Sequence, residues 1–99
     1  MDELAAKTIC DMAVSTGLSP EELKKRMAKL IHRFTTDKTC YLHHFQKRFY
    51  GTEEPSPEEW IKDLISIMVS DRYSISDHAY ACTAFYMASD PHVIRDWFE

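Results

Sequence analysis

The tetrapeptide Ser-Pro-Glu-Glu occurs twice in this chain, at residues 19–22 and 56–59. In each copy the serine can cap a helix, the proline suits the first helical position, and the second glutamate completes a capping box. A looser version, Ser-Ile-Ser-Asp, occupies residues 74–77, and Asp90-Pro91 is a further start signal. So many start signals in one short chain predict a fold built from several short helices.

Apolar residues between these signals recur with the period of an α-helix. The stripes consist of Leu23, Met27, Leu30, Ile31 and Phe34, then Leu42, Phe45 and Phe49, then Trp60, Ile61, Leu64, Ile65 and Met68, and last Val93, Ile94, Trp97 and Phe98. Gly17 and Gly51 stand where a left-handed residue would end a helix. These features predict six helices, near 2–16, 20–34, 38–50, 57–71, 75–88 and 91–98.

The segment from Ala79 to Ala88 contains no charged residue. A helix that is apolar all round is usually the central one of its fold, and the alanines of this segment argue against the alternative, a buried strand. We therefore expect an all-α fold, a compact bundle of about six short helices around a central apolar helix at 75–88. Trp60, Trp97 and several phenylalanines should fill the core, with Cys82 as a small core residue.

Length and composition limit the class of protein. A chain of 99 residues is long enough for one core, so we expect a single helical domain over residues 1–99. It has no apolar stretch that could span a membrane and no basic, apolar leader at its start. Its three cysteines are too few for a disulfide framework, which favours a reducing, cytoplasmic location.

The sequence contains no recognisable catalytic motif. It contains no G-x-S-x-G elbow, no phosphate-binding glycine loop, no dinucleotide fingerprint and no H-E-x-x-H. Asp77 and His78 are adjacent, but side chains one residue apart on a helix diverge by about 100° and cannot act together as base and orienting group. We therefore expect a protein without catalytic activity, without a cofactor and without a small-molecule substrate.

Cysteine and histidine residues form the one pattern with metal-ligand spacing. Cys40 and His43 would share one helix face, as would His78 and Cys82, and a mixed sulfur and nitrogen set suits zinc. His44 is a further donor on the first face. However, the gap between the pairs holds a whole predicted helix, unlike a compact zinc module, so we predict that no metal is bound.

Charge is distributed unevenly along the chain. Residues 1–50 carry a net charge of +3 and residues 51–99 a net charge of −7, which together give the overall −4. The acidic side chains gather around the start of the fourth predicted helix, at Glu53, Glu54, Glu58, Glu59 and Asp63. Such a cluster can attract a basic partner. Glu58 and Glu59 can equally stabilise a helix start, whereas Glu53 and Glu54 have no evident structural role.

Residues 9–23 contain a second candidate for binding. Ala13 lies four residues before Gly17, Leu18 and Ser19 follow the glycine, and Leu23 points inward. This segment resembles the helix-turn-helix pattern of bacterial and phage regulators. The resemblance implies that Ser19, Lys24, Lys25 and Ala28 lie near DNA, and Lys29 and Arg33 could neutralise phosphates on the same helix. Glu21 and Glu22 at the start of that helix would face DNA phosphates, and the repulsion between like charges argues against DNA binding.

These observations favour a small binding or regulatory protein that contacts another protein through its acidic residues Glu53, Glu54, Glu58, Glu59 and Asp63. An inhibitor of a nucleic-acid-handling machine, of phage or mobile-element type, fits the size and acidity of the chain. The alternative is a DNA-binding regulator that uses the helices at 2–16 and 20–34. The five tyrosines, Tyr41, Tyr50, Tyr73, Tyr80 and Tyr86, suit either a core or an interface.

Overall fold

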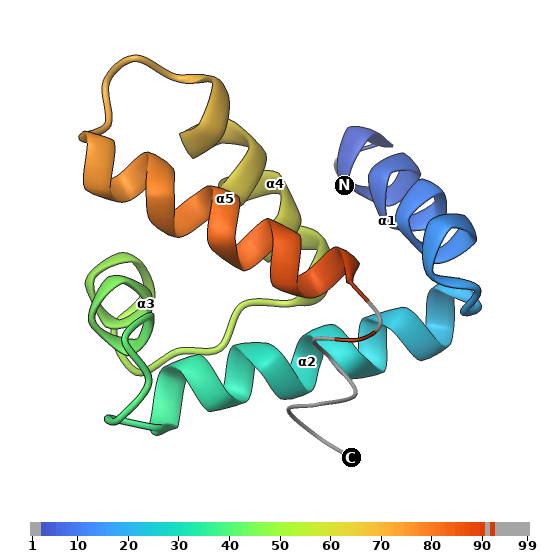
Figure 1. Cartoon of the computed structure of the whole chain (residues 1–99), viewed down its shortest axis with the longest axis horizontal. Helices are drawn as coiled ribbons and strands as arrows, with labels where there is room; N and C mark the ends of the chain where they lie inside the picture. The colour runs from blue at the N-terminus through green and yellow to red at the C-terminus, as the bar shows by residue number, and fades with distance from the viewer. Residues whose placement is uncertain (1–2, 91, 93–99) are drawn as a thin grey trace.

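The computed structural model describes residues 3–90 and 92, and it confirms the all-α fold. Within these residues the chain forms α1 (Glu3–Thr16), α2 (Pro20–Thr36), α3 (His43–Tyr50), α4 (Pro57–Val69) and α5 (Ile75–Ser89) (Figure 1). The predicted helix at 91–98, with Trp97, lies outside the described residues apart from His92. None of the helices in the described part of the chain is both long and apolar enough to cross a membrane.

The predicted helix starts at Ser19, Ser56 and Ser74 are confirmed. The hydroxyls of Ser19 and Ser56 accept hydrogen bonds from the backbone N–H of Glu22 and Glu59, with a proline at the first turn of each helix. Ser74 and the third helical residue of α5 form a reciprocal capping box. Each cap satisfies backbone donors that the first turn of a helix leaves without partners.

Gly17 ends α1 with a positive φ of 75°. Its N–H donates to the carbonyl of Val14 at 3.3 Å, and the N–H of Leu18 donates to the carbonyl of Ala13 at 3.1 Å. This pair of bonds is a Schellman motif, which reverses the chain and satisfies the last carbonyls of the helix. Figure 1 shows α1 and α2 meeting as a corner at this turn.

The predicted helix at 38–50 begins later than expected, at His43. The reason is Asp37, whose carboxylate oxygen Oδ1 accepts hydrogen bonds from both the backbone N–H and the hydroxyl of Thr39. Two successive turns follow. The N–H of Cys40 donates to the carbonyl of Asp37 in the first, and the N–H of His43 donates to the carbonyl of Cys40 in the second. Aspartate side chains stabilise such turns in competition with a helix. Cys40 therefore does not share a helix face with His43.

The predicted apolar stripes of α2 and α4 supply most of the core, and the predicted stripe at 93–98 lies outside the described residues. The fully buried large side chains are Ile9, Leu23, Met27, Leu30, Ile31, Phe34, Leu42, Trp60, Ile61, Leu64 and Tyr80. Helix α5 crosses the middle of the view in Figure 1 and packs against α4, α1 and α2. It buries Ala81, Ala84 and Ala88, which allow close approach of the neighbouring helices. Its opposite side faces solvent, and the expectation that Cys82 is a core residue is wrong because Cys82 lies on that side.

Helix α3 is held by side chains that meet Tyr80 of α5. The Tyr80 ring stacks on Phe45 and Phe49, with ring centroids 5.5 and 5.6 Å apart. The Tyr80 hydroxyl donates to Oε1 of the buried Gln46 at 2.8 Å. Arg48 forms an ion pair with the buried Asp77 at the start of α5. Stacking, a buried hydrogen bond and an ion pair therefore fix a helix of only eight residues.

Replacement of Gly17 by alanine tests the turn between α1 and α2. A Cβ atom at Gly17 would meet nothing within 4 Å, so the cost comes from the left-handed backbone alone. We expect Gly17→Ala to lower the free energy of unfolding by about 1 kcal/mol, measured by urea denaturation. The control is Ser15→Ala at an exposed position of α1, expected within about 0.5 kcal/mol of the parent. An unchanged Gly17→Ala variant would contradict the assigned turn.

Candidate functional site

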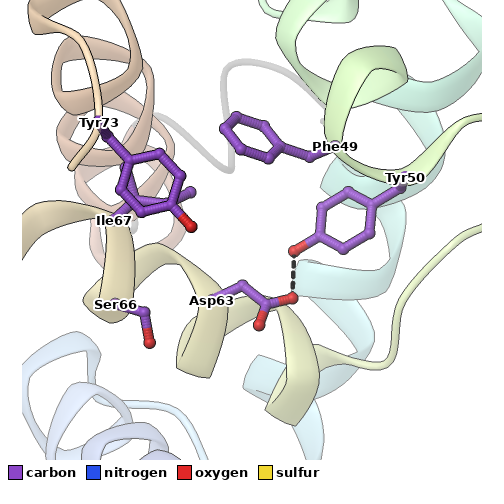
Figure 2. A pocket seen from close by; sticks show the side chains of 6 residues that line it. All are labelled: Phe49, Tyr50, Asp63, Ser66, Ile67 and Tyr73. Carbon is purple, nitrogen blue, oxygen red and sulfur yellow. Dashed lines mark hydrogen bonds between the residues drawn. The ribbon is translucent and has the colours of Figure 1, made fainter. Parts of the chain in front are cut away.

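A pocket of about 100 Å³ opens between α3, α4 and the loop that joins α4 to α5. Its lining comprises Phe49, Tyr50, Asp63, Ser66, Ile67 and Tyr73. Figure 2 shows these side chains around one space, with the rings of Phe49 and Tyr73 on one side and Asp63 at the base. The volume is well above that of one water and well below the roughly 300–1,000 Å³ of sites for cofactors and drug-sized ligands.

Asp63 and Tyr50 form the polar part of this pocket. The Tyr50 hydroxyl donates to Oδ2 of Asp63 at 2.7 Å, drawn as the dashed line in Figure 2. Burial, and next the hydrogen bond to Asp63, raise the pKa of Tyr50 far above its ordinary range. Tyr50 is therefore a neutral donor at physiological pH, and its hydroxyl occupies one of the two carboxylate oxygens of Asp63.

The aromatic side of the pocket depends on the docking of α3. Phe49 contacts Tyr73 with ring centroids 6.1 Å apart, and its ring also stacks on Tyr80. Burial raises the pKa of Tyr80 from 10.0 to about 12. Contacts with neutral aromatic side chains such as Tyr80 therefore hold the core side of α3 in place, and with it Phe49 and Tyr50.

The five predicted acidic residues have different surroundings. Glu53 and Glu54 are exposed before α4, Glu59 is exposed on its first turn, and Glu58 and Asp63 are half-buried. Glu54 Oε1 lies 2.9 Å from Nδ1 of His32 on α2, an exposed contact that the sequence did not predict. Glu59 accepts a hydrogen bond from the hydroxyl of its capping residue Ser56. Of the five, Asp63 alone lines the pocket.

The residues implied by the helix-turn-helix resemblance lie along α2 and its cap. Lys24 pairs with Glu21 at 3.8 Å, and Arg33 pairs with Asp37 at 3.3 Å. Ser19 caps the helix. Lys25, Ala28 and Lys29 are exposed on the surface of α2. The structure therefore leaves Lys25, Ala28 and Lys29 on an open helix surface, while the other three side chains take part in local contacts.

The cysteine and histidine residues with metal-ligand spacing have other partners. Nδ1–H of His43 donates to the carbonyl of Phe34 at 2.9 Å, and Nε2–H of His78 donates to the carbonyl of Ser70 at 2.6 Å. These bonds satisfy carbonyls at the ends of α2 and α4. Among residues 3–90 and 92, no three His, Cys, Asp or Glu side chains gather in a way that could hold a metal ion.

Searches of protein-family models, curated proteins and solved structures found no match to this chain. Function must therefore be argued from the chemistry of the pocket and the surface. Sequence reasoning singled out Asp63 but did not assign Tyr50 and Tyr73, and it placed Phe49 in a core stripe. A sequence signal for the pocket is weak, because its walls come from three separate elements.

Alkaline unfolding tests the buried state of Tyr80. The raised pKa means that the folded state favours the neutral phenol, so this contribution to stability is complete below pH 10 and is lost as the pH rises to about 12. We expect the free energy of unfolding to fall over this range and Tyr80→Phe to make the fall less steep. The measurement is urea denaturation at a series of pH values. Equal slopes for the two proteins would show that the Tyr80 phenol is not buried as described.

Proposed function

We propose that this chain is a non-catalytic binding protein that contacts a basic protein through the acidic face, defined as Glu53, Glu54, Glu58, Glu59 and Asp63. The observation that carries the proposal is that Asp63 lines the aromatic pocket on α4, the helix whose first turn carries Glu58 and Glu59. Exposed carboxylates can steer a basic partner over distance, and a pocket can then fix it in place.

The lining of the pocket favours binding over catalysis. Its polar side chains are those of Tyr50, Asp63, Ser66 and Tyr73, and it contains no histidine, cysteine or lysine. The Tyr50 hydroxyl donates to Asp63, and among the described residues no hydrogen bond joins Ser66 to Asp63 or to another base. The small volume suits the end of one side chain better than a metabolite. A macromolecule that inserts a single side chain is therefore the ligand we propose.

The charge of the acidic face indicates the class of partner. Proteins that bind nucleic acids carry basic surfaces, and an acidic protein can compete with nucleic acid for such a surface. We therefore propose an inhibitor or regulator of a nucleic-acid-handling protein, of the kind found in phages and mobile elements, acting in the cytoplasm. The steering contribution should appear mainly in the association rate.

DNA binding through α1 and α2 is the second candidate. The observation that favours it is the exposed surface of Lys25, Ala28 and Lys29 after a tight turn at Gly17. Against it, exposed Glu21 lies on the first turn of the same helix and would repel phosphates. The acidic face is therefore the better supported surface.

Salt dependence separates the second candidate from the first. If α2 binds DNA, each lysine that contacts a phosphate adds about 0.9 to the slope of log affinity against log salt. The DNA hypothesis predicts that replacing both Lys25 and Lys29 by alanine lowers the slope by about two. Because we favour the acidic face, we expect no binding to duplex DNA even at low salt in a fluorescence anisotropy titration. Tight, salt-dependent binding that needs both lysines would instead support the DNA-binding function.

Charge reversal tests the acidic face directly. We expect Glu53→Lys with Glu54→Lys to slow association with a lysine-rich peptide about tenfold, because steering is lost. Stopped-flow fluorescence at low salt measures the rate. Stability should change little, since the pair between His32 and Glu54 is exposed.

The matched control is Glu3→Lys with Asp11→Lys, which changes the net charge equally on exposed positions of α1. We expect this control to slow association much less. Equal slowing by the two double variants would mean that net charge alone attracts the peptide, and the acidic face would not be the binding surface.

A further inference from the structure

We infer that the pocket of Phe49, Tyr50, Asp63, Ser66, Ile67 and Tyr73 receives the ammonium group of a lysine side chain from the partner protein. This inference rests on the proposed function and names the chemical group that the site recognises. Three features of the pocket carry it: oxygens without partners, aromatic rings beside them, and a volume that excludes larger ligands.

Three oxygens of the pocket have no hydrogen-bond partner among the described residues. They are Oδ1 of Asp63, the hydroxyl of Ser66 and the hydroxyl of Tyr73, and they come from α4 and the following loop. Figure 2 shows the Tyr73 hydroxyl directed toward Asp63, whereas the Ser66 hydroxyl points away from the space between them. An ammonium group has three N–H donors and no acceptor. The free acceptors on Asp63 and Tyr73 therefore suit the donors of this group, and the Asp63 carboxylate supplies the opposite charge.

The hydrogen bond from Tyr50 favours lysine over arginine. A guanidinium binds a carboxylate most strongly with two parallel N–H donors, one to each oxygen. Oδ2 of Asp63 already accepts the Tyr50 hydroxyl at 2.7 Å. Oδ1 of Asp63 is therefore the carboxylate oxygen without a hydrogen-bond donor. A single oxygen suits an ammonium group, which can direct one N–H at it and its others at different acceptors.

Aromatic rings provide the second contribution. An ammonium group within about 6 Å of a tyrosine ring gains cation–π attraction, which increases when water is excluded. Tyr73 is 38% exposed and stands at the opening of the pocket, so its ring is available to a ligand. Phe49 serves as an apolar wall instead, because its ring already contacts Tyr80 and the Arg48 guanidinium.

Among the described residues no cation of the protein forms an ion pair with Asp63. Arg48 pairs with Asp77 and stacks on Phe45 and Phe49. Lys62 precedes Asp63 on α4, so their side chains diverge by about 100° around the helix. Arg72 is exposed on the loop beside Tyr73 and forms no ion pair among the described residues. The negative charge of Asp63 is therefore open to a cation from outside.

Two peptides that differ at one position test the inference. The probe is a short peptide with one central lysine, and its reference has norleucine there, which keeps the aliphatic stem and removes the charge. We expect the lysine peptide to bind at least tenfold more tightly, and Asp63→Asn to remove this preference. The asparagine oxygen can still accept from Tyr50, so the pocket should keep its shape. Isothermal titration calorimetry measures both affinities.

The matched control variant is Glu3→Gln, which removes the same charge from an exposed position of α1 outside both the pocket and the acidic face. We expect it to weaken the lysine peptide less than twofold. Tyr73→Leu, at a half-exposed loop position, gives an independent test that does not alter Asp63, and we expect it to reduce the preference for lysine as well. The melting temperature of each variant shows whether the fold is kept.

Other outcomes would overturn the inference. If both peptides bind equally, or if Asp63→Asn and Glu3→Gln have equal effects, the pocket does not select lysine. In that case the proposed function still stands if Glu53→Lys with Glu54→Lys slows association, so the two claims fail separately. If n-butylammonium binds with the same dependence on Asp63 while the lysine peptide does not, the ligand is a free amine and a protein side chain is excluded.

Discussion

The contact between Tyr80 and helix α3 is the interaction on which the binding surface depends. Helix α3 has eight residues, and its one fully buried side chain is the polar Gln46. Apolar burial alone would hold such a helix weakly. Tyr80 compensates by stacking on Phe45 and Phe49 while its hydroxyl donates to Gln46. A buried hydroxyl must be satisfied, so this bond also fixes the position of α3 along α5.

The position of α3 in turn determines the pocket. Phe49 and Tyr50 lie on its last turn, and the Tyr50 hydroxyl reaches Asp63 of α4. Arg48, between the two phenylalanines in sequence, is drawn to the buried Asp77 at the start of α5. The same helix therefore supplies aromatic walls to the pocket and keeps its own cation away from Asp63. This division of roles leaves one carboxylate oxygen open to a partner.

The local signals in the sequence were sufficient to predict most of the helices. Serine caps and apolar stripes depend on neighbours within a few residues, so Ser19, Ser56 and the stripe from Leu23 to Phe34 could be interpreted directly. The start of α3 could not be predicted in this way, because Asp37 stabilises a turn that competes with the helix. Cys82 was misplaced because small apolar residues occur on both sides of α5, and only packing decides which side is buried.

The pocket was harder to predict than the helices. Asp63 was identified by charge, but its role depends on Tyr50, thirteen positions earlier, and on Tyr73 in a loop. No local pattern links these residues, since they meet only when α3, α4 and the loop pack together. The same holds for the contact between Glu54 and His32, which joins two segments of opposite charge. Charge asymmetry thus indicated the surface, and tertiary packing defines the site within it.

The most direct test of this account is an isotope-filtered NOE measurement on the complex with the central-lysine peptide. The account predicts contacts from the ε-methylene protons of the peptide lysine to the ring protons of Tyr50 and Tyr73. Contacts only to residues of α2, such as Ala28, or contacts to the acidic face without the tyrosine rings, would contradict it.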